Sequence, residues 1–176
     1  MHNITSSPKY QRGAVLAISL IMLLVLTLLG VTAMRTTVLE EKMAGNMNDR
    51  NVAFQAAETA LRDGEALIET LVATASFNGS GGRLGEADAD PDFFNAATWS
   101  DNDSIAYSGT LSGVAVQPRY ILKFVKRVEG DQGSLKVGGY GNDKASDVSN
   151  FRVTARGIGK SESSLSILQA YYGKNM

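Results

Sequence analysis

Apolar residues dominate the chain between Ala14 and Met34, where the sequence AVLAISLIMLLVLTLLGVTAM contains no charged residue. A helix over this stretch has a length of roughly 30 Å, which matches the thickness of the hydrocarbon core of a bilayer. The polar residues within it, Ser19, Thr27 and Thr32, carry hydroxyls that a helix satisfies by bonding them to carbonyls one turn back. The pattern therefore predicts a membrane-spanning helix over residues 14–34.

The charges that flank the apolar run indicate how it crosses the membrane. Lys9 and Arg12 precede it without any acidic residue, whereas the basic residues that follow it are balanced by Glu40 and Glu41. Because basic segments stay on the cytoplasmic side, we expect the short N-terminus in the cytoplasm and the remainder of the chain across the membrane.

A cleaved secretory signal is the first alternative, since Val31, Thr32 and Ala33 resemble a signal-peptidase site. However, the apolar run exceeds the roughly 7–15 residues that are typical of such a signal. The helical pattern also continues past Ala33 to about residue 75 without a proline. The sequence therefore favours a retained anchor.

Residues 35–75 are rich in good helix formers and predict an amphipathic helix that continues the same axis. Large apolar residues recur every seven positions, at Met47, Phe54, Leu61 and Ile68. The positions three residues after each are mostly small or apolar, and are Arg50, Ala57, Gly64 and Leu71. This spacing makes one narrow stripe, which we interpret as the cover of a domain core. The residues expected to pack helix against sheet are Phe54, Ala57, Leu61, Gly64, Ile68 and Leu71.

Residues 76–176 predict a small sheet domain with long loops. A glycine-rich loop at 76–85 ends the helix, and alternating apolar and polar residues predict strands at 119–128, 151–158 and 164–172. The last two are close enough to form an antiparallel hairpin, weaker strand signals lie at 104–107 and 111–116, and residues 129–150 predict a long polar loop. The stripe on the helix supplies the cover for an antiparallel sheet, which makes the expected fold class α+β.

Composition removes most catalytic chemistry. The 176 residues include no cysteine, and the single histidine is His2, so triads and histidine- or thiolate-based metal sites have no residues to build them. The net charge of -1 gives no general attraction to nucleic acid. We therefore expect no enzyme activity, no cofactor, no metal and no nucleic-acid partner.

Two charged groups allow more than one interpretation. Asp88, Asp90 and Asp92 offer oxygen ligands of the kind calcium takes, but they lack the glycine and distal glutamate of an EF-hand, so a solvated acidic loop is favoured. The second group lies on one face of the strand at 119–128 and consists of Arg119, Lys123 and Arg127. It suits either an acidic partner or a solvated sheet face.

Three stretches together resemble the type IV pilin-like proteins, and more closely the PilX-type minor pilins. They are residues 11–65, which begin QRGAVLAISLIMLL, then PRYILKFV at 118–125, and FRVTARGIGKSESSLSILQAYY at 151–172. The first stretch is highly specific and the later two are suggestive. The resemblance implies a pilin-like fold, in which a long N-terminal helix packs on a small antiparallel sheet.

The resemblance also implies how the N-terminus is processed. A prepilin peptidase is expected to cut after Gly13, which removes a leader at 1–13 that contains Lys9 and Arg12, and Ala14 is expected to be N-methylated. Most pilins carry glutamate at the fifth mature residue, where this chain has Ile18. Gly30 is either a point of local helix loosening during assembly or a tolerated small residue in a membrane helix.

The implied function is that of a minor pilin that helps to initiate type IV pilus assembly at or near the fibre tip and supports twitching motility and adhesion. Its implied partners are other minor pilins, the major pilin, prepilin peptidase, the inner-membrane assembly platform, membrane lipid and a large tip adhesin. A type II secretion pseudopilin shares the anchor and remains an alternative. A membrane-tethered periplasmic enzyme or ligand-binding domain is disfavoured, because it needs a convergent pocket and the mature chain has no histidine or cysteine to furnish one.

Overall fold

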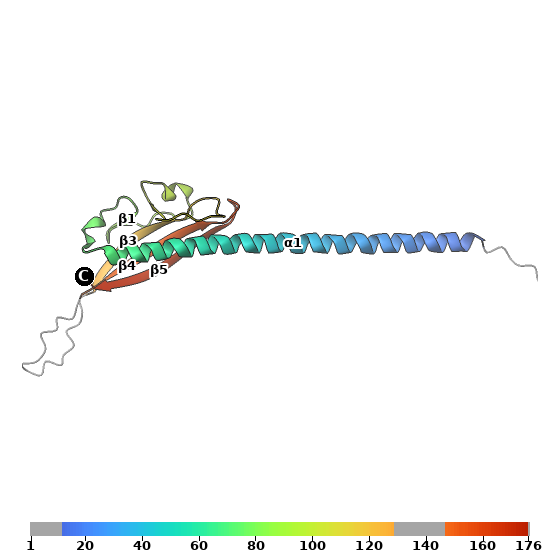
Figure 1. The fold of residues 1–176 in the computed structure, drawn as a ribbon, viewed down its shortest axis with the longest axis horizontal. Helices are drawn as coiled ribbons and strands as arrows, with labels where there is room; N and C mark the ends of the chain where they lie inside the picture. The colour runs from blue at the N-terminus through green and yellow to red at the C-terminus, as the bar shows by residue number, and fades with distance from the viewer. Residues whose placement is uncertain (1–11, 129–146, 176) are drawn as a thin grey trace, which may run out of the picture. The chain divides into compact units, whose positions relative to one another are not determined.

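The computed structural model describes residues 12–128 and 147–175, so the leader residue Lys9 and most of the predicted loop at 129–150 lie outside the described part. The chain divides into two compact units, residues 1–45 and residues 46–176. One helix, α1 (Arg12–Thr70), contributes to both units (Figure 1). The prediction that the apolar run and the amphipathic stretch form one helix is therefore confirmed.

The helix α1 ends at Thr70, five residues earlier than its expected end at residue 75, and a short 3-10 helix follows at Thr74–Ser76. The C-terminal strand explains this end. The Lys174 ammonium donates to the carbonyl oxygens of Ile68 (3.1 Å), Glu69 and Leu71 (2.7 Å) at the end of the helix, where the Ile68 carbonyl also accepts from the Leu71 amide at 3.1 Å. Those contacts satisfy the last turn where the chain leaves the helical path.

Five strands form one sheet with the order β1-β3-β4-β5, while β2 pairs with another part of β3. Their bounds are β1 Arg83–Leu84, β2 Ile105–Ala106, β3 Arg119–Val128, β4 Val148–Ile158 and β5 Leu165–Asn175. A second 3-10 helix lies at Ala96–Trp99. The pairs β2–β3, β3–β4 and β4–β5 are antiparallel, whereas β1 runs parallel to β3.

The predicted strand at 119–128 and the predicted C-terminal hairpin are confirmed, although β4 begins at Val148 and β5 continues to Asn175. Two details differ. Residues 111–116 form no strand, and the loop expected at 76–85 contains β1, which makes the sheet mixed rather than purely antiparallel. Only the tertiary fold places Arg83 and Leu84 beside β3, because two residues carry no periodic signal of their own.

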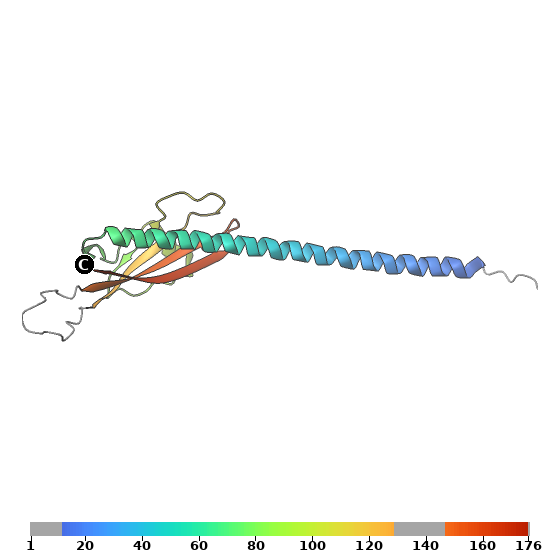
Figure 2. The same ribbon diagram turned by 60° about the horizontal axis from the view of Figure 1, so that its bottom comes forward.

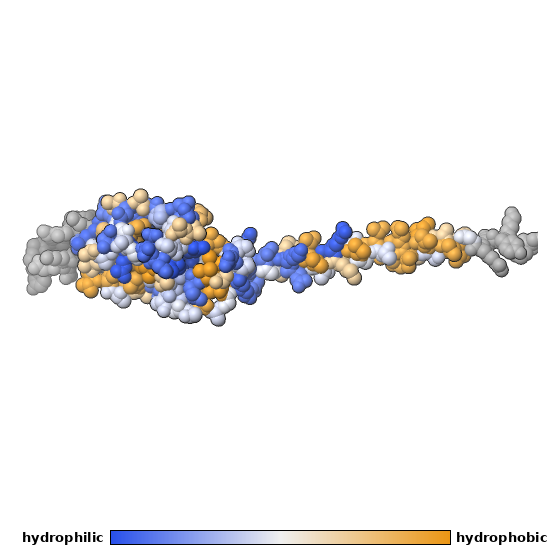
Figure 3. Space-filling view, turned by 90° about the horizontal axis from the view of Figure 1, so that it is seen from above, coloured by the Kyte–Doolittle hydropathy of each residue, from blue (hydrophilic) through white to orange (hydrophobic). Residues whose placement is uncertain are grey.

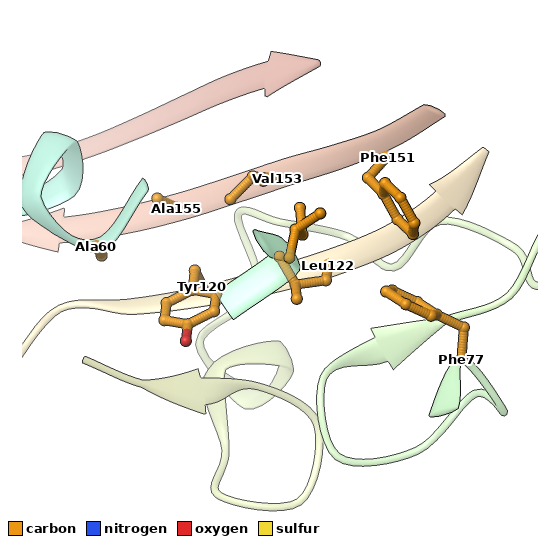
Figure 4. Packing of buried hydrophobic residues seen from close by; sticks show 8 residues of the cluster. Ala60, Phe77, Tyr120, Leu122, Phe151, Val153 and Ala155 are labelled. Atoms are coloured by element: carbon orange, nitrogen blue, oxygen red, sulfur yellow. The ribbon is translucent and has the colours of Figure 1, made fainter. Parts of the chain in front are cut away.

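The hydrophobic core lies between the sheet and the part of α1 that begins at Asn46 (Figure 1, Figure 2). Tyr120 and Leu122 of β3 and Phe151, Val153 and Ala155 of β4 all point to this side (Figure 4). The buried residues of the cluster are Ala60, Ile68, Phe77, Tyr120, Leu122, Phe151, Val153 and Ala155. Their alternation along both strands follows the two-residue period by which one face of the sheet points toward α1.

Small residues bring the α1 backbone unusually close to β4. Ala53, Ala56, Ala57 and Ala60 of α1 are all buried. A Cβ atom built on Gly157 would lie 2.1 Å from the carbonyl oxygen of Ala53 and 2.4 Å from the amide nitrogen of Ala57. The helix therefore packs on this strand through backbone and methyl groups rather than through large side chains.

The six residues expected to pack helix against sheet fall into two groups. Ala57, Gly64 and Ile68 are buried, and a Cβ built on Gly64 would lie 2.7 Å from Cγ1 of Val153. Leu61 and Leu71 are half-buried and pack against the core cluster. Phe54 does not belong to this contact, because 48% of its surface is exposed. The alanines at 53, 56 and 60, which the stripe did not include, are buried instead, and Ala53 and Ala57 lie directly against Gly157.

Candidate functional site

The first part of α1 presents an apolar surface. Every residue from Gly13 to Asn48 is exposed, including Val15, Leu16 and Leu29 at 60% or more (Figure 3). In the described part of the chain, α1 is the one helix that is long and apolar enough to cross a membrane. Because a soluble protein rarely exposes so much contiguous apolar surface, this segment is a candidate membrane anchor.

The polar side chains within the apolar run are satisfied inside the helix. The Ser19 hydroxyl donates to the Leu16 carbonyl at 2.9 Å and that of Thr27 donates to Leu24 at 2.8 Å. Thr32 donates in the same way to Leu28 at 2.7 Å. This agrees with the prediction for these hydroxyls, and such a segment would present no unpaired hydroxyl donor to hydrocarbon.

The residues implied in processing and assembly lie along this exposed helix. Gly13 and Ala14 occupy its first turn, and no atom lies within 4 Å of a Cβ built on Gly13. Ile18 is 61% exposed and shares a shallow apolar groove with Val15, Met22 and their neighbours. The helix continues without interruption through Gly30. All four residues are accessible to another molecule.

The acidic residues at 88–103 are engaged with the sheet or with neighbouring residues of their own loop. Asp90 pairs with Lys123 at 2.8 Å and also with Arg152, and the Lys123 ammonium, followed by Arg152, holds the pKa of Asp90 below its usual value. Asp88 accepts a hydrogen bond from the Gly85 amide at 2.7 Å. Within residues 12–128 and 147–175 no three acidic, histidine or cysteine side chains gather as metal ligands.

The same ion pairs account for the basic face of β3, for which the sequence left two interpretations open. Arg119 pairs with Asp101 at 2.8 Å, and its guanidinium also donates to Ser104 and Ser100. Arg127 pairs with Asp147 at 2.8 Å. With Lys123 bound to Asp90, the cations of this face bind acidic residues of their own chain.

The loop between β1 and β3 thus covers the second face of the sheet. Trp99 is buried at its centre, where the Arg156 guanidinium lies 5.7 Å from the centre of the indole ring. Ile121 of β3, which points to this side, is 2% exposed. The sequence carries no signal for these contacts, because they join residues that are far apart in the chain.

Asp49 makes a second set of contacts for which the sequence carries no signal. Its carboxylate accepts from the Lys160 amide at 2.6 Å, from the Ser161 amide at 3.1 Å and from the Ser161 hydroxyl. These hydrogen bonds, above all that of the Ser161 side chain, lower the pKa of Asp49 to about 2. Asp49 therefore fixes the turn between β4 and β5 against α1.

The first part of α1 is exposed and apolar, and its second part packs on a small sheet. This arrangement defines the pilin-like class of α+β protein. The family model PilX N-terminal matches residues 12–62, and the model Type IV pilus assembly protein PilX C-term matches residues 48–174. The chain belongs to the PilX family of type IV pilus assembly proteins. The corresponding comparisons with curated proteins and with solved structures give no significant match.

The family assignment makes the chain a minor pilin related to type IV pilus assembly, in a family of structural pilus components. It also favours the pilus over the type II secretion system, the alternative that the anchor alone left open.

Proposed function

We propose that this chain is a minor pilin that helps to start type IV pilus assembly and occupies a position at or near the fibre tip, where it supports twitching motility and adhesion. Before assembly it is held in the inner membrane by residues 14–34, with the N-terminus on the cytoplasmic side. Prepilin peptidase removes the leader after Gly13 and leaves Ala14 as an N-methylated terminus.

The exposed apolar helix supports an assembly step in which this segment leaves the membrane. Its side chains are apolar and its hydroxyls are bonded within the helix. Moving the helix from lipid into a bundle of similar helices therefore exposes little hydrocarbon to water. The assembly platform lifts the subunit, and the major pilin and the other minor pilins supply the bundle.

Ile18 is the observation that carries the proposed position in the fibre. A carboxylate at the centre of a bilayer costs roughly 2.5–3.5 kcal/mol on insertion scales. Where pilins carry glutamate here, pairing with the amino terminus of the subunit ahead offsets this cost. A subunit at the start of the fibre has no subunit ahead of it. An isoleucine in this position, exposed on the helix, suits such a subunit.

Three measurements test this proposal. Mass spectrometry of the chain from sheared fibres is expected to find a methylated Ala14 at the N-terminus, and a mature start at Met34 would contradict the anchor. Immunogold labelling of an epitope-tagged chain is expected at fibre ends, together with other minor pilins and a large adhesin. Regular labelling along the shaft would contradict the tip position. A strain that lacks the chain is expected to lose its fibres and to regain them when the wild-type chain is supplied.

A further inference from the structure

The apolar stripe predicted on α1 is not covered by the sheet along its whole length. Met47 and Phe54 belong to the stripe by spacing, yet 67% and 48% of their surfaces are exposed. Arg50, which lies between them on the same helical face, is exposed as well. This part of the stripe has no partner within the described residues.

A groove of about 740 Å³ runs beside this face, between α1 and the beginning of β5. Its apolar surface comes from Phe54 and from Leu165, which is 44% exposed. Its polar lining residues are Asn46, Arg50, Asn51, Ser163, Ser164 and Ser166. The groove thus offers two exposed apolar side chains surrounded by amides and hydroxyls.

The charge of the groove indicates the chemistry of its occupant. Arg50 is the only charged lining residue, and within the described part of the chain no ion pair or hydrogen bond satisfies its guanidinium. The nearby carboxylate of Asp49 is bound to the turn at residues 160 and 161 instead. A matching surface therefore carries a carboxylate for Arg50 next to apolar side chains for Phe54 and Leu165.

We infer that this groove, defined by Arg50, Phe54 and Leu165, receives a helix of a neighbouring fibre subunit that bears a carboxylate between apolar residues. The inference rests on the proposed function, because it requires the chain to be part of a fibre. The exposed segment at residues 39–43 of this chain, LEEKM, shows that a pilin-like helix presents such chemistry. Contact between a groove on one subunit and a helix on the next is a heterologous contact, which propagates along a filament.

Photocrosslinking in cells tests the inference with the full chain. Benzoylphenylalanine replaces Phe54 in one strain and Phe94 in the control strain, since Phe94 is also an exposed aromatic residue but lies outside the groove. The expected adduct at position 54 is at least about fivefold stronger than at position 94, and its partner peptide comes from a carboxylate-bearing helical segment of another fibre subunit. An adduct with lipid, one with a non-helical segment, or equal adducts at both positions would overturn the inference.

Charge variants test the role of Arg50. R50E is expected to reduce the adduct at position 54 by roughly fivefold or more, because it replaces attraction with repulsion, and R50K is expected to retain most of it. R62E, which reverses an exposed arginine of the same helix outside the groove, is expected to leave the adduct unchanged. An equal loss in R50E and R62E would contradict a specific contact at Arg50.

The fibre fraction separates failure of this inference from failure of the proposed function. If the chain is present in sheared fibres but position 54 gives no subunit adduct, the groove is not the contact and the minor pilin assignment stands. If the chain is absent from fibres of a piliated strain, the proposed function and the inference both fail.

Discussion

Gly157 is the position where the close packing of α1 on the sheet is most sensitive to a single methyl group. In G157A the new Cβ would lie 2.1 Å from the Ala53 carbonyl oxygen and 2.4 Å from the Ala57 amide nitrogen. Both atoms belong to the helix backbone, so no side-chain rotation relieves the overlap, and the whole helix must move away from β4. Overpacking in cores typically costs about 1–3 kcal/mol, and we expect the upper end of this range here.

A loss of about 3 kcal/mol is a large part of the stability of a small domain and lowers its Tm by roughly 10 °C. The assay is thermal unfolding of the full chain in detergent, followed by fluorescence of Trp99, which is the only tryptophan and is buried. The matched control is G173A in β5, where the added Cβ meets only side-chain atoms, at 3.3 Å. We expect its Tm to stay within about 2 °C of the wild type.

The comparison between the two glycine variants decides whether the packing argument holds. Equal Tm values for G157A and the wild type would show that the helix does not approach β4 as closely as described. Equal losses in both variants would show that a general strand effect, and not the contact with α1, is responsible.

Three further predictions concern the polar contacts of the second unit. D49N is expected to lower the Tm near neutral pH. The pKa of Asp49 is about 2 in the folded chain against an ordinary value of 3.8, so its stabilisation is present above about pH 4 and is lost as the pH falls toward 2. The Tm of D49N should therefore depend less on pH in that range than the Tm of the wild type. D90N is expected to lower the Tm by about 3–5 °C and to shift Trp99 emission to the red, because the loop between β1 and β3 loses its carboxylate link to the sheet. Unchanged emission would argue against this link. K174M is expected to lower the free energy of unfolding by about 1 kcal/mol and to speed hydrogen exchange of the amides at residues 68–71. Exchange at the wild-type rate would show that the helix end does not depend on Lys174.

The sequence alone predicted the elements that rest on local patterns. An uncharged apolar run as long as a bilayer is thick identifies the first part of α1, and alternation identifies β3 and the hairpin of β4 and β5. The resemblance at residues 11–65 also identified the family to which the chain belongs. These features are predictable because each depends on a periodicity that neighbouring residues share.

The face of α1 that packs on the sheet was predicted only in part. A heptad of large residues placed Phe54 in the contact, whereas the structure leaves it half-exposed and buries Ala53, Ala56 and Ala60, which the prediction did not include. The sequence pattern reports which helical face is apolar, but the distance between helix and strand decides which apolar residues fit. Gly157 sets that distance, and it lies about a hundred positions away in the chain.

The sequence by itself therefore determined that this protein has a membrane-length apolar helix, an amphipathic continuation and a small sheet, because hydrophobic periodicity is a local property. Only the tertiary structure decided that β1 joins the sheet in parallel, that Asp90 and Asp101 neutralise the basic face of β3, and that Phe54 stays exposed beside Arg50. Each of these depends on contacts between distant segments, and such contacts are fixed by packing and charge pairing in three dimensions rather than by the order of neighbouring residues.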